Sequence, residues 1–270
     1  MAKRQKKGES ETNGSQQMLI DERRQHILSL VQNQGRVLVG ELSRSLGIST
    51  ITIRKDLECL HSKGLIQRAH GGALRLQSGA LFDPSLQEKE KLHAREKRLI
   101  AAAAAEMVEE GQCIMLDSGT TTAAVAHALK KFSRLTVITN AVNIAADLSS
   151  TDFEVILVGG SLRKNSFSLV GPLAEDVLEE MHADIFFLGS DGFDLEVGVT
   201  TPNFLESRVG RAMVKASKRV VTVCDSTKFG RRSLSRIVPV TSVHCVITDK
   251  NIPHEMEEGL RALGIELVLV

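Results

Sequence analysis

A run of short polar side chains, residues 117–122 (DSGTTT), combines the groups that hold a phosphate in proteins. It follows an apolar run and precedes a helix-forming segment, so its glycine and hydroxyls fall at the start of a helix. Free backbone N–H groups and the positive end of the helix dipole bind anions at such a position. The run is not a nucleotide P-loop, because the G-x-x-x-x-G-K-[ST] spacing and its lysine are missing. Taken alone, the run is equally compatible with a plain helix cap.

Four further apolar runs in the same half of the chain also end in polar or glycine-rich stretches. In chain order these are Thr139-Asn140, Gly159-Gly160, Gly189-Ser190-Asp191-Gly192 and Asp225-Ser226-Thr227-Lys228. Turn chemistry alone explains five such endings in succession poorly. Carboxylate and amide groups suit sugar hydroxyls, and Lys228 with the DSGTTT run suits a phosphate. The combination predicts a site for a phosphorylated sugar.

The elements that must position these residues are strands and helices in alternation. Continuous apolar strands alternating with helices indicate a mainly parallel sheet covered on both faces. Ligands bind such sheets beyond the carboxyl ends of the strands. The apolar runs are 113–117, 135–140, 153–160, 183–190, 219–225, 243–249 and 265–270. We expect one long helix at 87–110, because residues 101–105 are all alanine, a strong helix former.

A second group of informative residues lies near the N-terminus, at 49–57 (STITIRKDL). A short amphipathic helix ended by glycine, 40–47, precedes it. Ser49 and Thr50 can cap the following helix and face a phosphate. The exposed side of that helix is expected to carry Thr52, Arg54 and Lys55, and its buried stripe Ile51, Ile53, Leu57 and Leu60. This order predicts a helix-turn-helix whose second helix enters the major groove of DNA.

The stretch 64–73 (GLIQRAHGGA) predicts a short strand and a glycine turn that carry two more basic side chains, Arg68 and His70. Together with the preceding helices, it predicts a winged helix-turn-helix. An ordinary amphipathic helix pair with a solvated basic face is the alternative. Basic residues on the helix itself and a tight exit at Lys63-Gly64 favour DNA binding.

The charge of the chain is unevenly distributed. Overall it has 34 Lys and Arg against 33 Asp and Glu. The first 76 residues hold 13 basic and 7 acidic side chains, a net charge of +6, and the remainder holds 21 and 26, a net charge of −5. A basic module is thus tethered to an acidic one, as expected if only the first meets a polyanion. Residues 1–18 are polar, lack an apolar run and are predicted to be a disordered basic tail.

The composition excludes several classes of protein. No stretch approaches the ~20 apolar residues that span a bilayer, and the N-terminus lacks the apolar segment of a secretory signal. The four cysteines are widely spaced without a C-x-x-C pattern, which favours buried free thiols over metal ligands. Tyr and Trp are absent, so stacking on single-stranded bases is disfavoured. We therefore expect a cytoplasmic protein that binds duplex DNA and needs no membrane, metal or cofactor.

The pair TIRKDL and HGGA resembles the winged helix of the DeoR family of bacterial transcription regulators. The second half resembles the sensor domain of the same family through DSGTTT, ITNAVNIA, LVGGSLR, LVGP, GSDGFD, GVTT and DSTKFG. The resemblance covers the chain from about Leu19 to its end. It implies an α/β sensor domain similar in fold to ribose-5-phosphate isomerase. It also implies these effector contacts: Asp117, Ser118, Gly119, Thr120, Thr121, Thr139, Asn140, Gly160, Asp191, Gly192 and Lys228.

Glu206, in NFLESR, is a further candidate contact with the effector. A surface ion pair with Arg208 or Arg211 is the alternative. Asp191, Asp194 and Glu206 could also serve sugar-phosphate isomerisation, which needs a base and a group that polarises a carbonyl. The related pentose-phosphate enzymes use a lysine in this region, however, and no lysine occurs between Lys164 and Lys215. We therefore predict that binding is retained and catalysis lost.

These observations predict a DNA-binding transcriptional regulator, a repressor of a carbohydrate catabolic operon released by a phosphorylated sugar. The expected domains are a winged helix-turn-helix at 19–75, a linker at 76–86, and a domain at 87–270 for effector binding and oligomerisation. Helix-turn-helix proteins usually bind paired half-sites, so a homodimer or homotetramer is expected, associated with the nucleoid when bound to its operator. An isomerase with a DNA-binding appendage and an architectural DNA-binding protein are the alternative functions.

Overall fold

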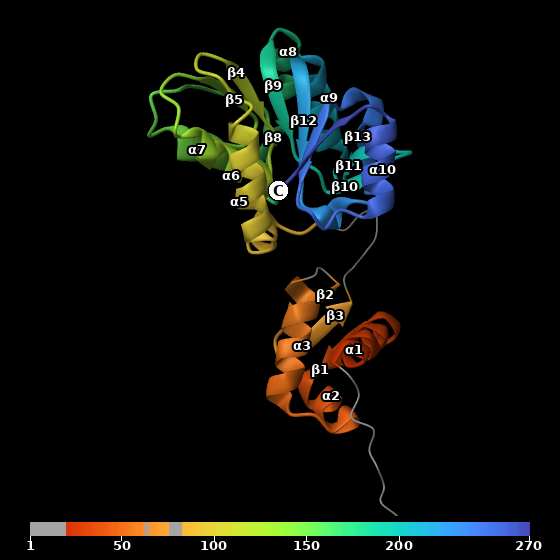
Figure 1. Ribbon diagram of the computed structural model, residues 1–270. Coiled ribbons are helices and arrows are strands. Elements are labelled where there is room, and N and C mark those ends of the chain that lie inside the picture. Colours follow the sequence, from red (N-terminus) through yellow and green to blue (C-terminus); the bar gives the residue numbers. More distant parts are fainter. Residues whose placement is uncertain (1–19, 63–64, 76–82) are drawn as a thin grey trace, which may run out of the picture. The chain divides into compact units, whose positions relative to one another are not determined.

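The computed structural model describes residues 20–62, 65–75 and 83–270 (Figure 1). The chain divides into two compact units, Met1–Leu76 and Gln77–Val270, and each unit has its own buried core. The predicted tail at 1–18, the Lys63-Gly64 exit and most of the predicted linker lie outside the described residues. No helix in the described ranges is long and apolar enough to cross a membrane.

The N-terminal unit combines a helix-turn-helix with a small antiparallel sheet. Ser49 caps the second helix of the motif, since its hydroxyl accepts a hydrogen bond from the Thr52 N–H at 3.2 Å. Gly47, with a φ of 65°, ends the first, and Gly71, with a φ of 81°, forms the turn of the wing. The elements are α1 (Ile20–Gln34), β1 (Arg36–Leu38), α2 (Val39–Leu46), α3 (Thr50–Ser62), β2 (Ile66–Ala69) and β3 (Gly72–Arg75). The sheet order is β1-β3-β2.

The buried stripe of α3 differs from the prediction at one position. Ile53, Leu57 and Leu60 are buried as expected, but Ile51 is 64% exposed. An α-helix turns about 100° per residue, so Ile51 lies roughly 200° around the axis from Ile53 and faces away from the core. Ile51 therefore shares the exposed side of α3 with Arg54, its neighbour one turn along the helix.

Asp56, the aspartate of TIRKDL, fixes α3 to α1. Its side chain is buried, and its two oxygens accept hydrogen bonds from Arg23 Nε at 2.6 Å and Arg24 Nε at 3.0 Å. Loss of one partner of a buried ion pair leaves an uncompensated charge. Asp56 of the TIRKDL motif therefore stabilises the N-terminal unit.

The C-terminal unit is built on a seven-stranded sheet in which every neighbouring pair is parallel. The order is β15-β14-β12-β9-β4-β5-β6. Each strand lies within or overlaps one of the seven apolar runs, which confirms the predicted α/β fold. The strands are β4 (Cys113–Leu116), β5 (Thr136–Thr139), β6 (Glu154–Leu157), β9 (Ala183–Leu188), β12 (Ser217–Val223), β14 (Cys245–Thr248) and β15 (Glu266–Leu269).

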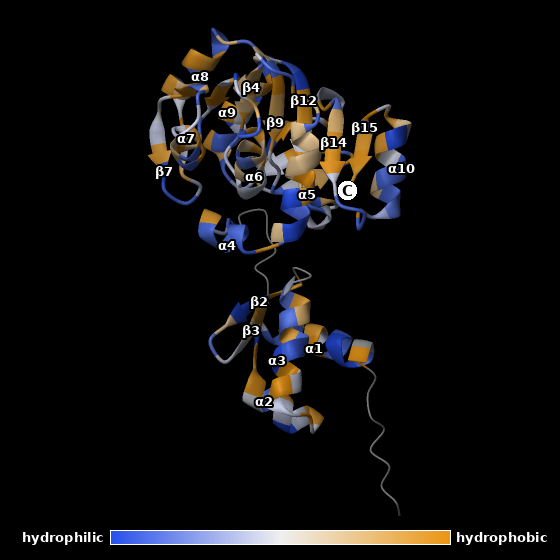
Figure 2. Ribbon diagram, turned by 60° about the vertical axis from the view of Figure 1, so that its left-hand side comes forward, coloured by the Kyte–Doolittle hydropathy of each residue, from blue (hydrophilic) through white to orange (hydrophobic). Residues whose placement is uncertain are grey.

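Both faces of this sheet are buried, which explains its apolar strands (Figure 2). One face packs on α5 (Ala94–Ala105), α6 (Thr120–Leu129) and α7 (Val142–Leu148). The other packs on α8 (Pro172–Glu179), α9 (Phe204–Lys215), α10 (His254–Ala262) and a small antiparallel sheet. That small sheet consists of β10 (Gly192–Asp194), β11 (Gly198–Thr201) and β13 (Ser235–Val238). The hairpin of β7 (Ser161–Arg163) and β8 (Ser168–Val170) completes the unit with two short 3-10 helices, η1 (Ser226–Lys228) and η2 (Val240–Ser242).

The single helix predicted at 87–110 is wrong, because the chain forms two helices there. The first, α4 (Leu86–Glu90), begins at a capping box between Ser85 and Glu88. It ends where the buried ammonium group of Lys97 donates to the carbonyl oxygens of Lys89 at 2.6 Å and Leu92 at 2.7 Å. His93 then adopts a left-handed conformation, with a φ of 52°, before α5 starts. A tertiary contact thus interrupts a segment with high helix propensity.

Candidate functional site

The polar stretches predicted at strand ends lie along one edge of the main sheet. β12, β9, β4, β5 and β6 are consecutive in the sheet, so their carboxyl ends are neighbours. The chain order reverses between β4 and β9, where ligands bind in open α/β sheets. Asp117 follows β4, and a Cβ atom at Gly189, after β9, would lie 3.4 Å from its Oδ2. Asp117 therefore occupies the centre of the candidate site.

The environment of Asp117 favours its protonated form. Burial, together with the carboxylates of Glu206 and Asp191, raises the pKa of Asp117 to about 8. The backbone N–H of Ser118 donates to Asp117 Oδ1 at 2.7 Å, which opposes this shift only in part. At neutral pH the side chain is mostly an uncharged carboxyl, which can both donate and accept a hydrogen bond.

Asp191, after β9, is held in the opposite state. Burial alone would raise the pKa of Asp191, but the ammonium groups of Lys89 and Lys228 hold it below its usual value. Lys89 Nζ lies 2.6 Å from Asp191 Oδ1, and Thr201 Oγ1 lies 3.4 Å from Oδ2. Lys89 lies on the short helix α4. Sequence reasoning missed it, because a lysine on a polar helix carries no signal of a distant partner.

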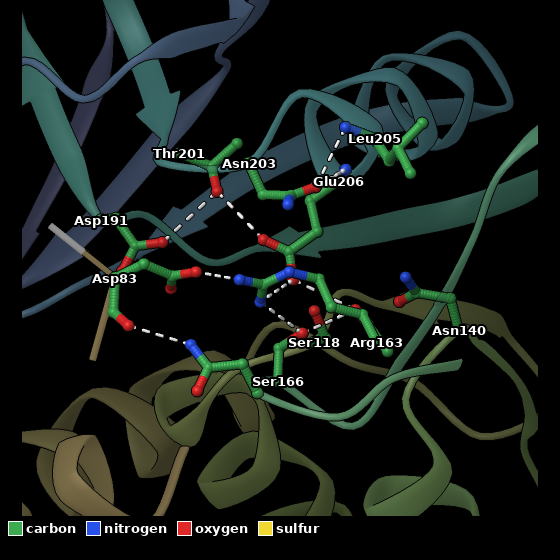
Figure 3. A network of polar contacts seen from close by, with 12 residues as sticks. Asp83, Ser118, Asn140, Arg163, Ser166, Asp191, Thr201, Asn203, Leu205 and Glu206 are labelled. Atoms are coloured by element: carbon green, nitrogen blue, oxygen red, sulfur yellow. Dashed lines mark hydrogen bonds and ion pairs between the residues drawn. The ribbon is translucent and has the colours of Figure 1, made fainter. Parts of the chain in front are cut away.

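Glu206 points into the same cluster (Figure 3). Asn203 caps α9 and so places Glu206 in the first turn of the helix. Glu206 Oε1 accepts from Arg163 Nη1 at 3.1 Å and Ser168 Oγ at 3.0 Å, and Oε2 accepts from Thr201 Oγ1 at 3.2 Å. The alternative of a surface ion pair is wrong, because Arg208 pairs with Glu175 and Arg211 donates to a backbone carbonyl.

Arg163, at the end of β7, joins the two sides of the cluster. Its guanidinium group forms ion pairs with Asp83 and Glu206 and donates to Ser166 Oγ at 2.9 Å (Figure 3). The structure thus forms one chain of contacts, which runs Asp83, Arg163, Glu206, Thr201, Asp191 and Lys89. Arg163 is the last residue of the LVGGSLR motif. The motif therefore pointed to Arg163, although the sequence-based prediction did not include it among the site residues.

Lys228 contributes a positive charge to the site. It ends η1, after β12, and its charge lowers the pKa values of both Asp191 and Asp225. Burial alone would raise the pKa of Asp225, but the neighbouring cations and a hydrogen bond from Thr227 together lower the pKa below its usual value. Asp225 caps η1 by accepting from the Thr227 N–H at 3.1 Å. Among the described residues Lys228 makes no ion pair.

The DSGTTT run lies at the start of α6, as expected. Gly119 is the residue before the helix, and no side chain caps it there. The first backbone N–H groups of α6 are therefore available to an anion, as at any uncapped helix start. Thr121 and Thr122 are buried, whereas Ser118 and Thr120 are partly exposed.

Three of the predicted effector residues have evident packing roles. The buried Thr139 hydroxyl donates to the Leu116 carbonyl at 2.8 Å and accepts from the Ala141 N–H at 3.1 Å. A Cβ atom at Gly160 would lie 2.7 Å from the Val170 carbonyl oxygen, and one at Gly192 would lie 2.6 Å from that of Arg231. Thr139 therefore holds neighbouring backbone in place through hydrogen bonds, and the two glycines allow backbone segments to pack closely.

Asn140 is different, because its side chain is only half satisfied. Its amide nitrogen donates to the Leu169 carbonyl at 3.2 Å. Its Oδ1 atom is buried and has no hydrogen-bond partner among the described residues. A buried acceptor without a partner is costly, and a ligand hydroxyl would satisfy it.

The predicted DNA-binding residues lie on α3 and the wing. Ser49, Thr50, Arg54, Lys55 and His70 are exposed, and Thr52 is partly exposed. Arg68 is engaged within its own unit, since Nη1 donates to the Gly72 carbonyl at 3.1 Å and Nε lies 3.6 Å from Glu58. Arg68 therefore orders the wing in addition to adding positive charge.

Comparisons with protein families match both units. A DeoR-like helix-turn-helix domain matches residues 23–78, and a DeoR C terminal sensor domain matches residues 92–250. The chain is 41% identical to a putative aga operon transcriptional repressor of Escherichia coli O157:H7, over 92% of this chain and 93% of that protein. It is 34% identical to the glycerol-3-phosphate regulon repressor of Escherichia coli K12, over 92% of this chain and 98% of that protein. These relatives are regulators rather than enzymes.

A search of solved structures finds a distant likeness for part of the chain. Ribose 5 phosphate isomerase A from Neisseria gonorrhoeae matches with a TM-score of 0.37 and 18% identity, over 50% of this chain and 53% of that one.

Proposed function

Because the chain belongs to the DeoR family of transcriptional regulators, we propose that it represses a carbohydrate catabolic operon and is released by a phosphorylated sugar. The observation that carries this proposal is the cluster at the strand ends. It combines an uncharged carboxyl at Asp117, the Asn140 oxygen that has no hydrogen-bond partner among the described residues, and the positive charge of Lys228, close to the start of α6. A ligand with hydroxyls at one end and a phosphate at the other complements these groups.

The phosphate is expected at the start of α6, where backbone N–H groups, Ser118, Thr120 and Lys228 supply donors. The sugar hydroxyls are expected to contact Asp117, Asn140 and Asp191, whose oxygens accept hydrogen bonds. The similarity to a glycerol-3-phosphate regulon repressor supports a phosphorylated effector.

The winged helix is proposed to bind the operator through α3. Arg54 and Lys55 contact phosphates or base edges in the major groove, and the exposed Ile51 suits the methyl group of a thymine. His70, at the tip of the wing, reaches the adjacent backbone. We propose that the protein works in the cytoplasm as a symmetric homo-oligomer, because two half-sites need two copies of α3.

A thermal-shift panel of phosphorylated sugars tests the effector proposal. It includes galactosamine 6-phosphate, glucosamine 6-phosphate, ribose 5-phosphate and glycerol 3-phosphate, with the unphosphorylated compounds as controls. A ligand at a hundred times its dissociation constant stabilises the folded state by about 2.7 kcal/mol, so at least one phosphorylated compound is expected to raise the melting temperature. If none does, the effector proposal fails. Turnover of any compound would instead support the isomerase alternative.

A further inference from the structure

A short segment at the beginning of the C-terminal unit is tied across the candidate effector site. This segment, residues 83–93, which we call the strap, contains α4 and is the first described part of the unit after Leu76. Its first residue, Asp83, forms an ion pair with Arg163 and accepts at its backbone carbonyl from Asn165 Nδ2 at 2.9 Å. The Leu86 N–H donates to the Asn165 carbonyl, also at 2.9 Å.

The far end of the strap is tied to the opposite side of the same site. Lys89 pairs with Asp191 at 2.6 Å. Lys97 holds the backbone of the strap in register, because its ammonium group donates to the carbonyls of Lys89 and Leu92. Burial lowers the pKa of Lys97 to about 8, although the charge of Asp225 opposes the shift. Lys97 therefore positions Lys89 rather than serving as a surface charge.

Both ends of the strap engage groups that a phosphorylated sugar would also use. Asp83 occupies Arg163, whose guanidinium group otherwise can donate to the oxygen of a sugar hydroxyl, and Lys89 occupies Asp191, whose carboxylate otherwise can accept from another hydroxyl. Glu206 and Thr201 connect Arg163 to Asp191 (Figure 3). Because Lys89 pairs with Asp191, the two ion pairs belong to one continuous network. Loss of either ion pair, Asp83–Arg163 or Lys89–Asp191, therefore alters the direct contacts that lead to the other pair.

We propose that the strap is a latch that reports the occupancy of the effector site to the DNA-binding unit. This inference rests on the proposed function. A phosphorylated sugar competes with Asp83 for Arg163 and with Lys89 for Asp191, and so favours a state in which the strap is released. The strap is the first described part of the sensor unit after the DNA-binding unit, so it is the described segment of the sensor unit that lies nearest to the DNA-binding unit in sequence. The latched state is the one that binds the operator.

The test compares three variants of the full chain without any ligand. Asp83→Asn and Lys89→Gln each remove one ion pair of the latch, and Lys91→Gln is the matched control. Lys91 is exposed in the same segment and makes no ion pair among the described residues. Hydrogen exchange of residues 83–93 reports release of the strap. Fluorescence anisotropy with an operator fragment, selected from a random duplex library, reports DNA affinity.

Asp83→Asn and Lys89→Gln are expected to speed exchange in the strap and to weaken operator binding on the order of tenfold, within the 5- to 150-fold range of typical coupling between sites. Lys91→Gln is expected to change neither. Faster exchange with operator affinity within about twofold of wild type would overturn the proposal, as would unchanged exchange in both latch variants. Failure of the effector proposal is a separate outcome, because it is read from the wild-type thermal-shift panel.

Discussion

At the scale of single residues, the site depends on charges whose partners are distant in sequence. Asp117 and Asp191 follow neighbouring strands, yet one is held protonated and the other ionised. The charges of Lys89 and Lys228 lower the pKa of Asp191, whereas the carboxylate of Glu206 raises that of Asp117. Lys89 pairs with Asp191 although it lies 102 positions earlier in the chain. The sequence predicted both aspartates from their place after apolar strands. It could not predict their protonation states, because these depend on contacts that only the fold creates.

Asp117→Asn tests the protonation state of Asp117. The folded-state pKa is raised to about 8 against an unfolded value of about 3.9, so the folded protein binds more protons across this range. The stability that this group contributes is thus present below pH 4 and lost as pH rises toward 8. The amide mimics the protonated form, so the variant is expected to match wild type near pH 4, to melt progressively higher than wild type as the pH rises toward 8, and to melt on the order of 10 °C higher at pH 9. A melting-temperature difference independent of pH would contradict the assignment.

Asp56→Ala tests the structural role of the aspartate in TIRKDL. The change leaves Arg23, which is largely buried, without its carboxylate at 2.6 Å. Breaking such a pair costs about 3–5 kcal/mol, so the N-terminal unit is expected to unfold at clearly lower denaturant concentration. Glu41→Ala, at an exposed position of the same unit, serves as the control. Equal stability of the two variants in urea titrations would show that the buried pair contributes little.

At the scale of elements, the strands were predictable and the short connecting elements were not. Burial of both sheet faces imposes continuous apolar runs, and these can be recognised in sequence without tertiary information. The break between the helices at residues 91–93 depends on Lys97, whose ammonium group donates to two backbone carbonyl oxygens. The high helix propensity of the alanine-rich segment gives no sign of this contact. Ile51 was misplaced for a similar reason, since a short apolar cluster on α3 does not by itself define which side faces the core.

Arg54→Ala tests α3 as the element that binds the operator. Arg54 is exposed on α3 and is remote in sequence from the sensor residues. Loss of one base or phosphate contact costs about 1–3 kcal/mol, so operator affinity is expected to fall roughly 5- to 150-fold. Stabilisation by a phosphorylated sugar that binds wild type is expected to persist. Loss of both properties together would contradict a division of labour between the two units.

At the scale of the whole molecule, the chain joins a basic DNA-binding unit to an acidic sensor unit. The two have separate cores, and the charge difference of +6 against −5 was already visible in the sequence. Family matches assign each unit to a known domain type. The proposed control of DNA binding by the effector site is not visible in composition, because it rests on the ion pairs that tie the strap across the strand ends.

The central claim is that a phosphorylated sugar at the strand-end cluster controls operator binding. The most direct measurement is an anisotropy titration of the operator with and without a phosphorylated sugar that stabilises wild type, performed on wild type and Lys228→Ala. We predict that the sugar weakens operator binding about 5- to 150-fold in wild type and has little effect in Lys228→Ala, which still binds the operator normally. Equal weakening in both proteins would contradict the account, as would unchanged operator affinity in wild type.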